Sequence, residues 1–238
     1  MSNLVFLEPN NIKAIPFTTS DVIAEYAKIK HHAVQQMISK HEVSLKKFGQ
    51  VEFEMRKLSG GLSAPYEAES KTKPAFKMRP SKKSVTGQSE KIYHLNEEQA
   101  TLLITFLKNT EPVINFKVEL VKQFYEMRTE LQKRQINKLE LKPTRRTLTD
   151  EIKDNPNHSE WDYKLFTDLA YKMATGKIAS TLRKERGASK KAVALDYMTS
   201  DEIALVEKLT YKIAVLYEMG MDYYQIKDIL MKKYLKSA

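Results

Sequence analysis

The sequence predicts a mainly α-helical protein with a small β component. Seven glycines in 238 residues is less than half of the usual ~7%, and this scarcity disfavours folds that are rich in tight turns. Apolar residues recur at helical spacing through most of the chain, and capping patterns precede several of these stretches. Strand-like segments are few and short. We therefore expect helices around a small sheet.

The charge balance of the chain is basic. Forty Lys and Arg against thirty Asp and Glu give a net charge of +10, which favours nucleic acid, an anionic membrane surface or an acidic protein as partner. Residues 71–95 hold seven basic residues and one acidic residue, so the excess is localised. The absence of cysteine excludes disulfides and a Cys-ligated metal. No uncharged stretch exceeds nine residues, so we expect a cytoplasmic protein without a membrane partner.

Two helices are predicted near the amino terminus. The first begins near Thr18, because Thr18 and Asp21 have the spacing of a capping box. After a short basic break, a second helix covers about 31–45, with Val34 and Ile38 on its apolar stripe. Two helices joined by three or four residues have helix-turn-helix spacing.

A pair of strands follows these helices. Residues 51–55 alternate, with Val51, Phe53 and Met55 on one side, which predicts a half-buried strand. The chain returns to a strand-like pattern at 91–95, after a long polar and basic insertion over 58–90. Two helices and two strands in this order indicate a winged helix with an oversized wing.

The longest predicted helix covers 113–138 and begins after Pro112. It follows a shorter helix at about 97–108, which Asn96 caps. We expect part of its apolar seam to pack on the amino-terminal domain and its distal part to join two copies in a dimer. The alternative is that the distal part packs within one chain. The seam consists of Phe116, Leu120, Phe124, Met127 and Leu131.

Prolines and a shortage of large apolar residues mark 139–158 as a linker. The predicted domains are therefore 1–138, which is winged-helix-like and includes the insertion and the long helix, and 159–238, an all-α carboxy-terminal domain.

The candidate DNA-binding residues lie on the second helix and in the basic insertion. Gln35 and Gln36 can pair bidentately with adenine in the major groove, and cations in the insertion can contact phosphates. The alternatives are an ordinary solvated helix face and a plain linker. The full set is Lys30, His31, His32, Gln35, Gln36, Ser39, Lys40, Lys77, Arg79, Lys82 and Lys83.

The carboxy-terminal domain is rich in aromatic and basic residues. Aromatic side chains at helical spacing are more often core, but exposed tyrosines favour protein interfaces. We expect partner binding through Trp161, Tyr163, Tyr171, Arg183, Lys184, Tyr223 and Tyr224.

The sequence offers no positive evidence for catalysis. The adjacent His31 and His32 cannot face one way on a helix, and no Asp or Glu follows at metal-ligand spacing. Thr175-Gly176-Lys177 lacks the remaining parts of a nucleotide-binding loop. We expect no enzyme activity, metal or cofactor.

Several of these segments resemble the Rha family of phage regulatory proteins. The similarity includes 19–24, 93–96 and, most specifically, 120–128, and it covers most of residues 15–131. Residues 161–172 are similar to the carboxy-terminal domain of phage antirepressors of Gram-positive hosts. The insertion departs from the compact wing that the resemblance implies.

The resemblance implies a prophage-encoded regulator, and two hypotheses about its target stay open. In the first, a transcriptional regulator of the lysis/lysogeny type binds double-stranded DNA through the second helix and the basic wing. In the second, an antirepressor binds and inactivates a phage repressor by protein contact, without binding DNA. A homodimer suits both.

Overall fold

The computed structural model describes residues 3–57 and 89–234. They form two compact units, residues 18–57 with 89–113, and residues 3–17 with 114–234. We call the first the sheet unit and the second the helical unit. The expected mainly helical fold with a small sheet is confirmed. The division into units differs from the expected boundary, which placed residues 1–17 and the start of the long helix with the sheet.

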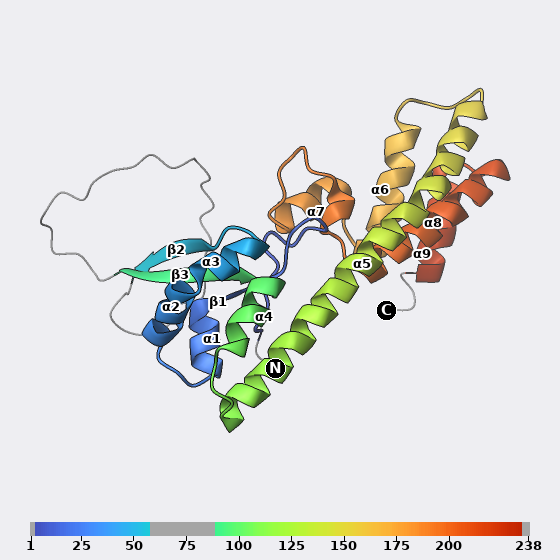
Figure 1. Cartoon of the computed structure of the whole chain (residues 1–238). Helices are drawn as coiled ribbons and strands as arrows, with labels where there is room; N and C mark the ends of the chain where they lie inside the picture. The colour runs from blue at the N-terminus through green and yellow to red at the C-terminus, as the bar shows by residue number, and fades with distance from the viewer. Residues whose placement is uncertain (1–2, 58–88, 235–238) are drawn as a thin grey trace, which may run out of the picture. The chain divides into compact units, whose positions relative to one another are not determined.

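The sheet unit combines a three-stranded sheet, in the order β1-β3-β2, with short helices (Figure 1). β2 and β3 are antiparallel, and Phe53 lies opposite Tyr93. Ile23 and Leu103 are fully buried in the core of this unit. Its elements are β1 (Phe17–Thr19), α1 (Ser20–Tyr26), α2 (His31–Lys40), α3 (Glu42–Leu45), the 3₁₀ turn η1 (Lys46–Phe48), β2 (Glu52–Lys57), β3 (Ser89–Asn96) and α4 (Glu97–Thr105).

The start of the sheet unit differs from its sequence-based description. A short strand, β1, precedes α1, and the residue before the helix is Thr19, whose side chain makes no capping hydrogen bond. The expected Thr18–Asp21 capping box is therefore wrong. The capping box of Asn96 and Gln99 at the start of α4 is confirmed.

Strand β2 forms where predicted, but it is not half-buried as expected, since Glu54 is its one partly covered residue. Phe53 and Met55 are 53% and 57% exposed, whereas Glu54 is half-buried. The reason is ionic, because Glu54 and Arg56 pair with each other, and Arg56 also reaches Asp21 at the start of α1. As an edge strand, β2 has only β3 beside it, so the ion pairs decide which face turns toward α1.

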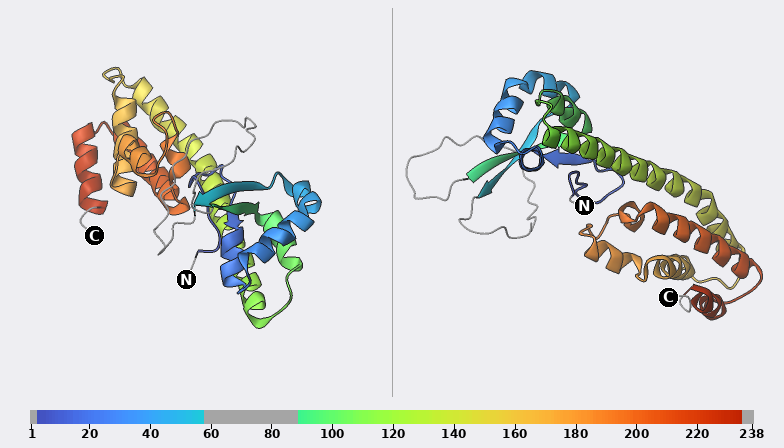
Figure 2. Two further views of the ribbon diagram at one scale, coloured as in Figure 1. Left: turned by 90° about the vertical axis from the view of Figure 1, so that its left-hand side faces the viewer. Right: turned by 90° about the horizontal axis from the view of Figure 1, so that it is seen from below.

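The long helix α5 covers Glu111–Asp154 and continues through the expected linker (Figure 2). Pro143 lies inside it, where a proline removes one backbone hydrogen bond and costs about 3 kcal/mol. Leu141, Leu148 and Ile152 are each at most 5% exposed, and burying each contributes roughly 1.5–3 kcal/mol. Their combined burial outweighs the proline, so the helix persists and the prediction of a linker at 139–158 is wrong.

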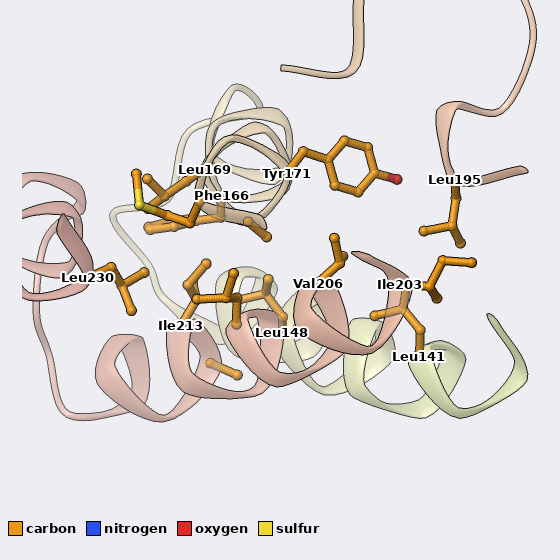
Figure 3. Packing of buried hydrophobic residues seen from close by; sticks show 14 of the residues in the cluster. Leu141, Leu148, Phe166, Leu169, Tyr171, Leu195, Ile203, Val206, Ile213 and Leu230 are labelled. Atoms are coloured by element: carbon orange, nitrogen blue, oxygen red, sulfur yellow. The ribbon is translucent and has the colours of Figure 1, made fainter. Parts of the chain in front are cut away.

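The helical unit packs α6 (Asp162–Thr175), α8 (Ser200–Glu218) and α9 (Tyr223–Tyr234) around the distal part of α5. Figure 3 shows Leu148 of α5, Phe166 of α6 and Ile213 of α8 meeting in one core. The unit also contains α7 (Ala179–Glu185) and the 3₁₀ turn η2 (Ala194–Tyr197). The predicted capping box of Thr199 and Glu202 at the start of α8 is confirmed.

Hydrogen bonds explain why residues 1–17 belong to the helical unit. The Leu4 amide donates to Gln123 Oε1 of α5 at 2.7 Å, and the Ile12 amide donates to the Asp196 carbonyl at 2.9 Å. Buried Arg134 donates to Asn10 Oδ1 at 2.8 Å. The amino-terminal segment is therefore fixed to α5 and η2.

We expect Ile152→Ala to destabilise the helical unit by about 2–4 kcal/mol, because Ile152 is fully buried and its truncation leaves a cavity. Leu139→Ala is the matched control, since Leu139 lies on the same helix and is 59% exposed. Urea unfolding followed by circular dichroism measures both changes. Equal effects of the two substitutions would contradict the assignment of residues 139–154 to a packed helix.

Candidate nucleic-acid interface

Helices α1 and α2 are joined by a tight connection, 27–30. Lys28 adopts a positive φ of 56°, which a residue other than glycine takes up only in a sharp turn. The exposed Lys30 precedes the first residue of α2. The two-helix arrangement with a short connection is thus present as the sequence predicts.

A chain of hydrogen bonds fixes the first turn of α2 to α1 and to β3. His31 Nε2 lies 2.8 Å from Ser20 Oγ, and His31 Nδ1 contacts the carboxylate of Glu90. The same Ser20 Oγ accepts the Tyr93 amide at 2.9 Å. These contacts join Ser20, His31 and Glu90 in one chain of hydrogen bonds.

Serine, histidine and a carboxylate in series are also the parts of a hydrolytic triad. Ser20 has no exposed surface, and its Oγ already accepts a backbone N–H from β3. In this conformation a substrate from solvent cannot reach the hydroxyl. The geometry therefore suits a fixed joint between three elements.

Gln35 extends the attachment by one helical turn. Its Nε2 donates to the Lys91 carbonyl at 2.8 Å, so its amide is occupied by strand β3. The sequence placed His31 and Gln35 on the open face of the helix, and the structure corrects this. Both are half-buried against β3, because the sheet covers this side of α2.

The open face of α2 carries a shorter set of polar side chains. His32, Gln36, Ser39 and Lys40 are exposed, and their spacing of four, three and one places them along one side of the helix. Val34 and Ile38 are buried on the other side. Amide, imidazole, hydroxyl and ammonium groups on one exposed helix face can contact base edges and phosphates.

The β2–β3 hairpin is tied to α1 beside this face. Arg56 donates to Asp21 Oδ2 at 2.7 Å and to Glu54 Oε1 at 2.9 Å. Burial alone would raise the pKa of Asp21, but the hydrogen bond from Thr19 and the Arg56 guanidinium outweigh it and hold that pKa below its ordinary value. The same carboxylates raise the pKa of Arg56 against the opposing effect of its partial burial.

The outer face of the hairpin combines aromatic rings with a cation. The Lys91 ammonium lies 3.8 Å from the Phe53 ring centre and 4.4 Å from that of Tyr93. Sequence reasoning missed this group, because it assigned Phe53 to the buried side. The sequence alone carried no signal for this group, because the register that places Phe53 opposite Tyr93 is set by the folded sheet.

The remaining predicted DNA contacts Lys77, Arg79, Lys82 and Lys83 lie outside the described residues. In the helical unit, Trp161 and Tyr224 are 68% and 77% exposed. Tyr171 is only 4% exposed, so its expected place on a partner surface is wrong; it packs in the core, and its hydroxyl accepts from Arg145 at 2.5 Å. Tyr163, Arg183 and Tyr223 are half-buried, and Lys184 is exposed.

A comparison with protein families places these features in a known group. The family model of the phage regulatory protein Rha matches residues 18–129. Residues 18–129 therefore match the Rha family. The match includes the whole sheet unit after Phe17 and the first part of α5. This match supports a role of the protein in phage regulation.

The rest of the chain lies outside the match with the Rha family. The expected similarity of residues 161–172 to antirepressor domains stays a prediction. A search among curated proteins found no match. None of the helices in the described ranges is long and apolar enough to cross a membrane.

We expect Asp21→Asn to destabilise the sheet unit by about 1 kcal/mol at pH 7, since the ion pair with Arg56 is partly exposed. Because the folded pKa of Asp21 is lowered, its contribution is complete above the ordinary value near pH 4 and disappears as the pH falls below it. Thermal unfolding of both proteins from pH 3 to pH 7 measures this. A stability difference that grows toward pH 3 would contradict the assignment.

Proposed function

We propose that this protein regulates phage transcription, in decisions of the lysis/lysogeny type, by binding double-stranded DNA through α2. The exposed polar face of α2, held rigidly by His31 and Gln35 on β3, is the observation that carries the proposal. The protein acts as a binding module without enzymatic chemistry, and it works in the cytoplasm of the bacterial host.

In the proposed complex, the open face of α2 enters the major groove. Gln36 pairs with a base edge, while Lys40 and Lys30 contact phosphates on either side. His32 and Ser39 add polar contacts to bases or backbone. The joint at Ser20, His31 and Glu90 supports specificity, since a recognition helix discriminates bases only when its position on the domain is fixed.

The β2–β3 hairpin acts as the wing in this proposal. It stands next to α2 through the Gln35–Lys91 hydrogen bond, and the exposed Lys57 ends the described part of β2. The sequence adds six cations between residues 71 and 83. Such cations supply affinity for the phosphate backbone with little base preference.

The double variant Gln36→Ala with Lys40→Ala should lose base discrimination and keep its fold, because both side chains are exposed and neither contacts the core. Each lost base contact costs ~1–3 kcal/mol. Gel shifts on duplexes selected by the wild type from a random-sequence library should therefore show a preference that is weaker by about fivefold or more.

Thr101→Ala with Lys108→Ala is the matched control, since it removes one hydroxyl and one cation from exposed positions of the sheet unit outside α2. This control should bind like the wild type. If the wild type enriches no duplex sequence, or if the α2 variant retains its full preference, α2 is not the recognition helix.

The exposed rings of the helical unit favour a second candidate function, an antirepressor that binds a phage repressor. Trp161 and Tyr224 are large amphipathic side chains left at 68% and 77% exposure, and such rings dominate protein interfaces. Lys184 and the half-buried Arg183 lie in the same unit. An acidic surface on a repressor would complement these cations.

For the antirepressor, Trp161→Ala with Tyr224→Ala should reduce capture of a phage repressor by more than tenfold, as expected for loss of interface anchors. Tyr211→Ala with Met219→Ala is the control, because Tyr211 on α8 and Met219 directly after it are 59% and 68% exposed. Co-precipitation of purified proteins measures the effect. Capture that both variants retain would place the interface elsewhere.

A further inference from the structure

A row of apolar side chains lies exposed along the first half of α5. Ile114, Val118, Val121 and Tyr125 are 43%, 65%, 50% and 60% exposed. Their spacing of four, three and four residues places them on one side of the helix. We call these four residues the α5 stripe, and all of them belong to the helical unit.

The α5 stripe is distinct from the seam that the sequence assigned to a dimer. Phe116, Leu120, Phe124 and Leu131 of that seam are at most 8% exposed within one chain. These side chains are therefore already packed, and the expectation that the distal seam joins two copies through Leu131 is wrong. The helix presents a second apolar face, which is exposed among the residues that the structure describes.

We propose that the α5 stripe is the interface through which two copies of this chain pair, helix against helix. Its spacing is that of core positions a and d in a heptad, which select a partner helix with the same pattern. The stripe itself has that pattern, so a second copy meets the requirement. The proposal concerns self-association and does not depend on the DNA site.

The charges around the stripe fit this occupant better than nucleic acid or an acidic partner. Residues 111–128 carry three acidic and three basic side chains, so the segment is neutral in a chain of net charge +10. A basic band would attract phosphates, whereas a neutral band with an apolar centre is compatible with a copy of itself.

Charge also selects the orientation of the two helices. In a parallel pair, Lys117 of one copy would face Lys122 of the other across the seam, and this repulsion would occur twice. In an antiparallel pair with its centre between Glu119 and Leu120, Lys122 faces Asn115. The antiparallel register also pairs Val118 with Val121, and Ile114 with Tyr125, of the second copy. The geometry points to an antiparallel dimer.

The size of the stripe sets the expected affinity. Four side chains over less than two heptads cover less than the ~800 Å² per partner of a standard stable interface. We therefore expect a reversible dimer that forms in the micromolar range. Two DNA-binding faces in one particle would then bind paired half-sites more tightly than either face alone.

Sedimentation equilibrium of the full chain, without DNA, tests the pairing. The wild type should shift from monomer to dimer between about 1 and 100 μM, and Val118→Glu with Val121→Glu should stay monomeric. Tyr211→Glu with Val215→Glu on α8, also exposed, should dimerise like the wild type. Circular dichroism checks that each variant is folded. A monomeric wild type over this range, or equal dimerisation of all three proteins, overturns the proposal.

Disulfide trapping tests the orientation of the two helices. Only the introduced cysteines can cross-link, because the chain has no native cysteine. In the antiparallel register, Ile114→Cys chains mixed with Tyr125→Cys chains should form a mixed disulfide upon oxidation. Two copies of Ile114→Cys should not cross-link, because their sites lie eleven residues or about 16 Å apart along the helix axis. Efficient Ile114→Cys homodimers with no mixed product would establish a parallel pair and refute the antiparallel one.

Discussion

The hydrogen-bonded joint of Ser20, His31 and Glu90 determines how the sheet unit presents α2. One histidine ring links the first residue of α1, the first residue of α2 and the second residue of β3. Gln35 repeats the attachment one turn later. His31 and Gln35 lie on the side of α2 that faces the sheet, where apolar side chains are usual. Because their hydrogen bonds are one turn apart, they fix both the direction of α2 and its rotation about its axis. Hydrogen bonds have narrower geometry than apolar contacts, so the joint fixes which side of α2 is exposed.

Helix α5 is stabilised in a different way, because both apolar burial and polar contacts hold it in place. Leu141, Leu148 and Ile152 bury its distal part, and polar side chains reinforce it at the start of α8, where Glu130 Oε1 accepts the Ser200 amide at 2.9 Å. Burial of Glu130 alone would raise its pKa, but the hydrogen bonds from Ser200 and Arg134 lower it below the ordinary value. A helix held by both apolar and ionic contacts tolerates an internal proline.

The sequence was sufficient for elements with strong local signals and insufficient where tertiary contacts decide. The capping boxes at Asn96 and Thr199 were recognisable, because each satisfies backbone donors within four residues. The end of α5 was not recognisable, because Pro143 indicated a linker although Leu141, Leu148 and Ile152 have helical spacing. The polar face of α2 was predicted as one surface, yet its division into His31 and Gln35 inside and Gln36 and Lys40 outside depends on β3, which arrives over fifty residues later.

The register of the hairpin has a consequence for the entropy of loop closure. Lys57 pairs with Ser89, and both Glu90 and Lys91 contact α2 from inside the strand. The connection between these strands therefore begins and ends outside the contacts that position the helix. Each doubling of the length of a flexible loop costs only about 0.6 kcal/mol, so the contacts of Glu90 and Lys91 with α2 depend little on how many residues separate Lys57 from Ser89. The long insertion is thus a position where new sequence can be acquired at little thermodynamic expense.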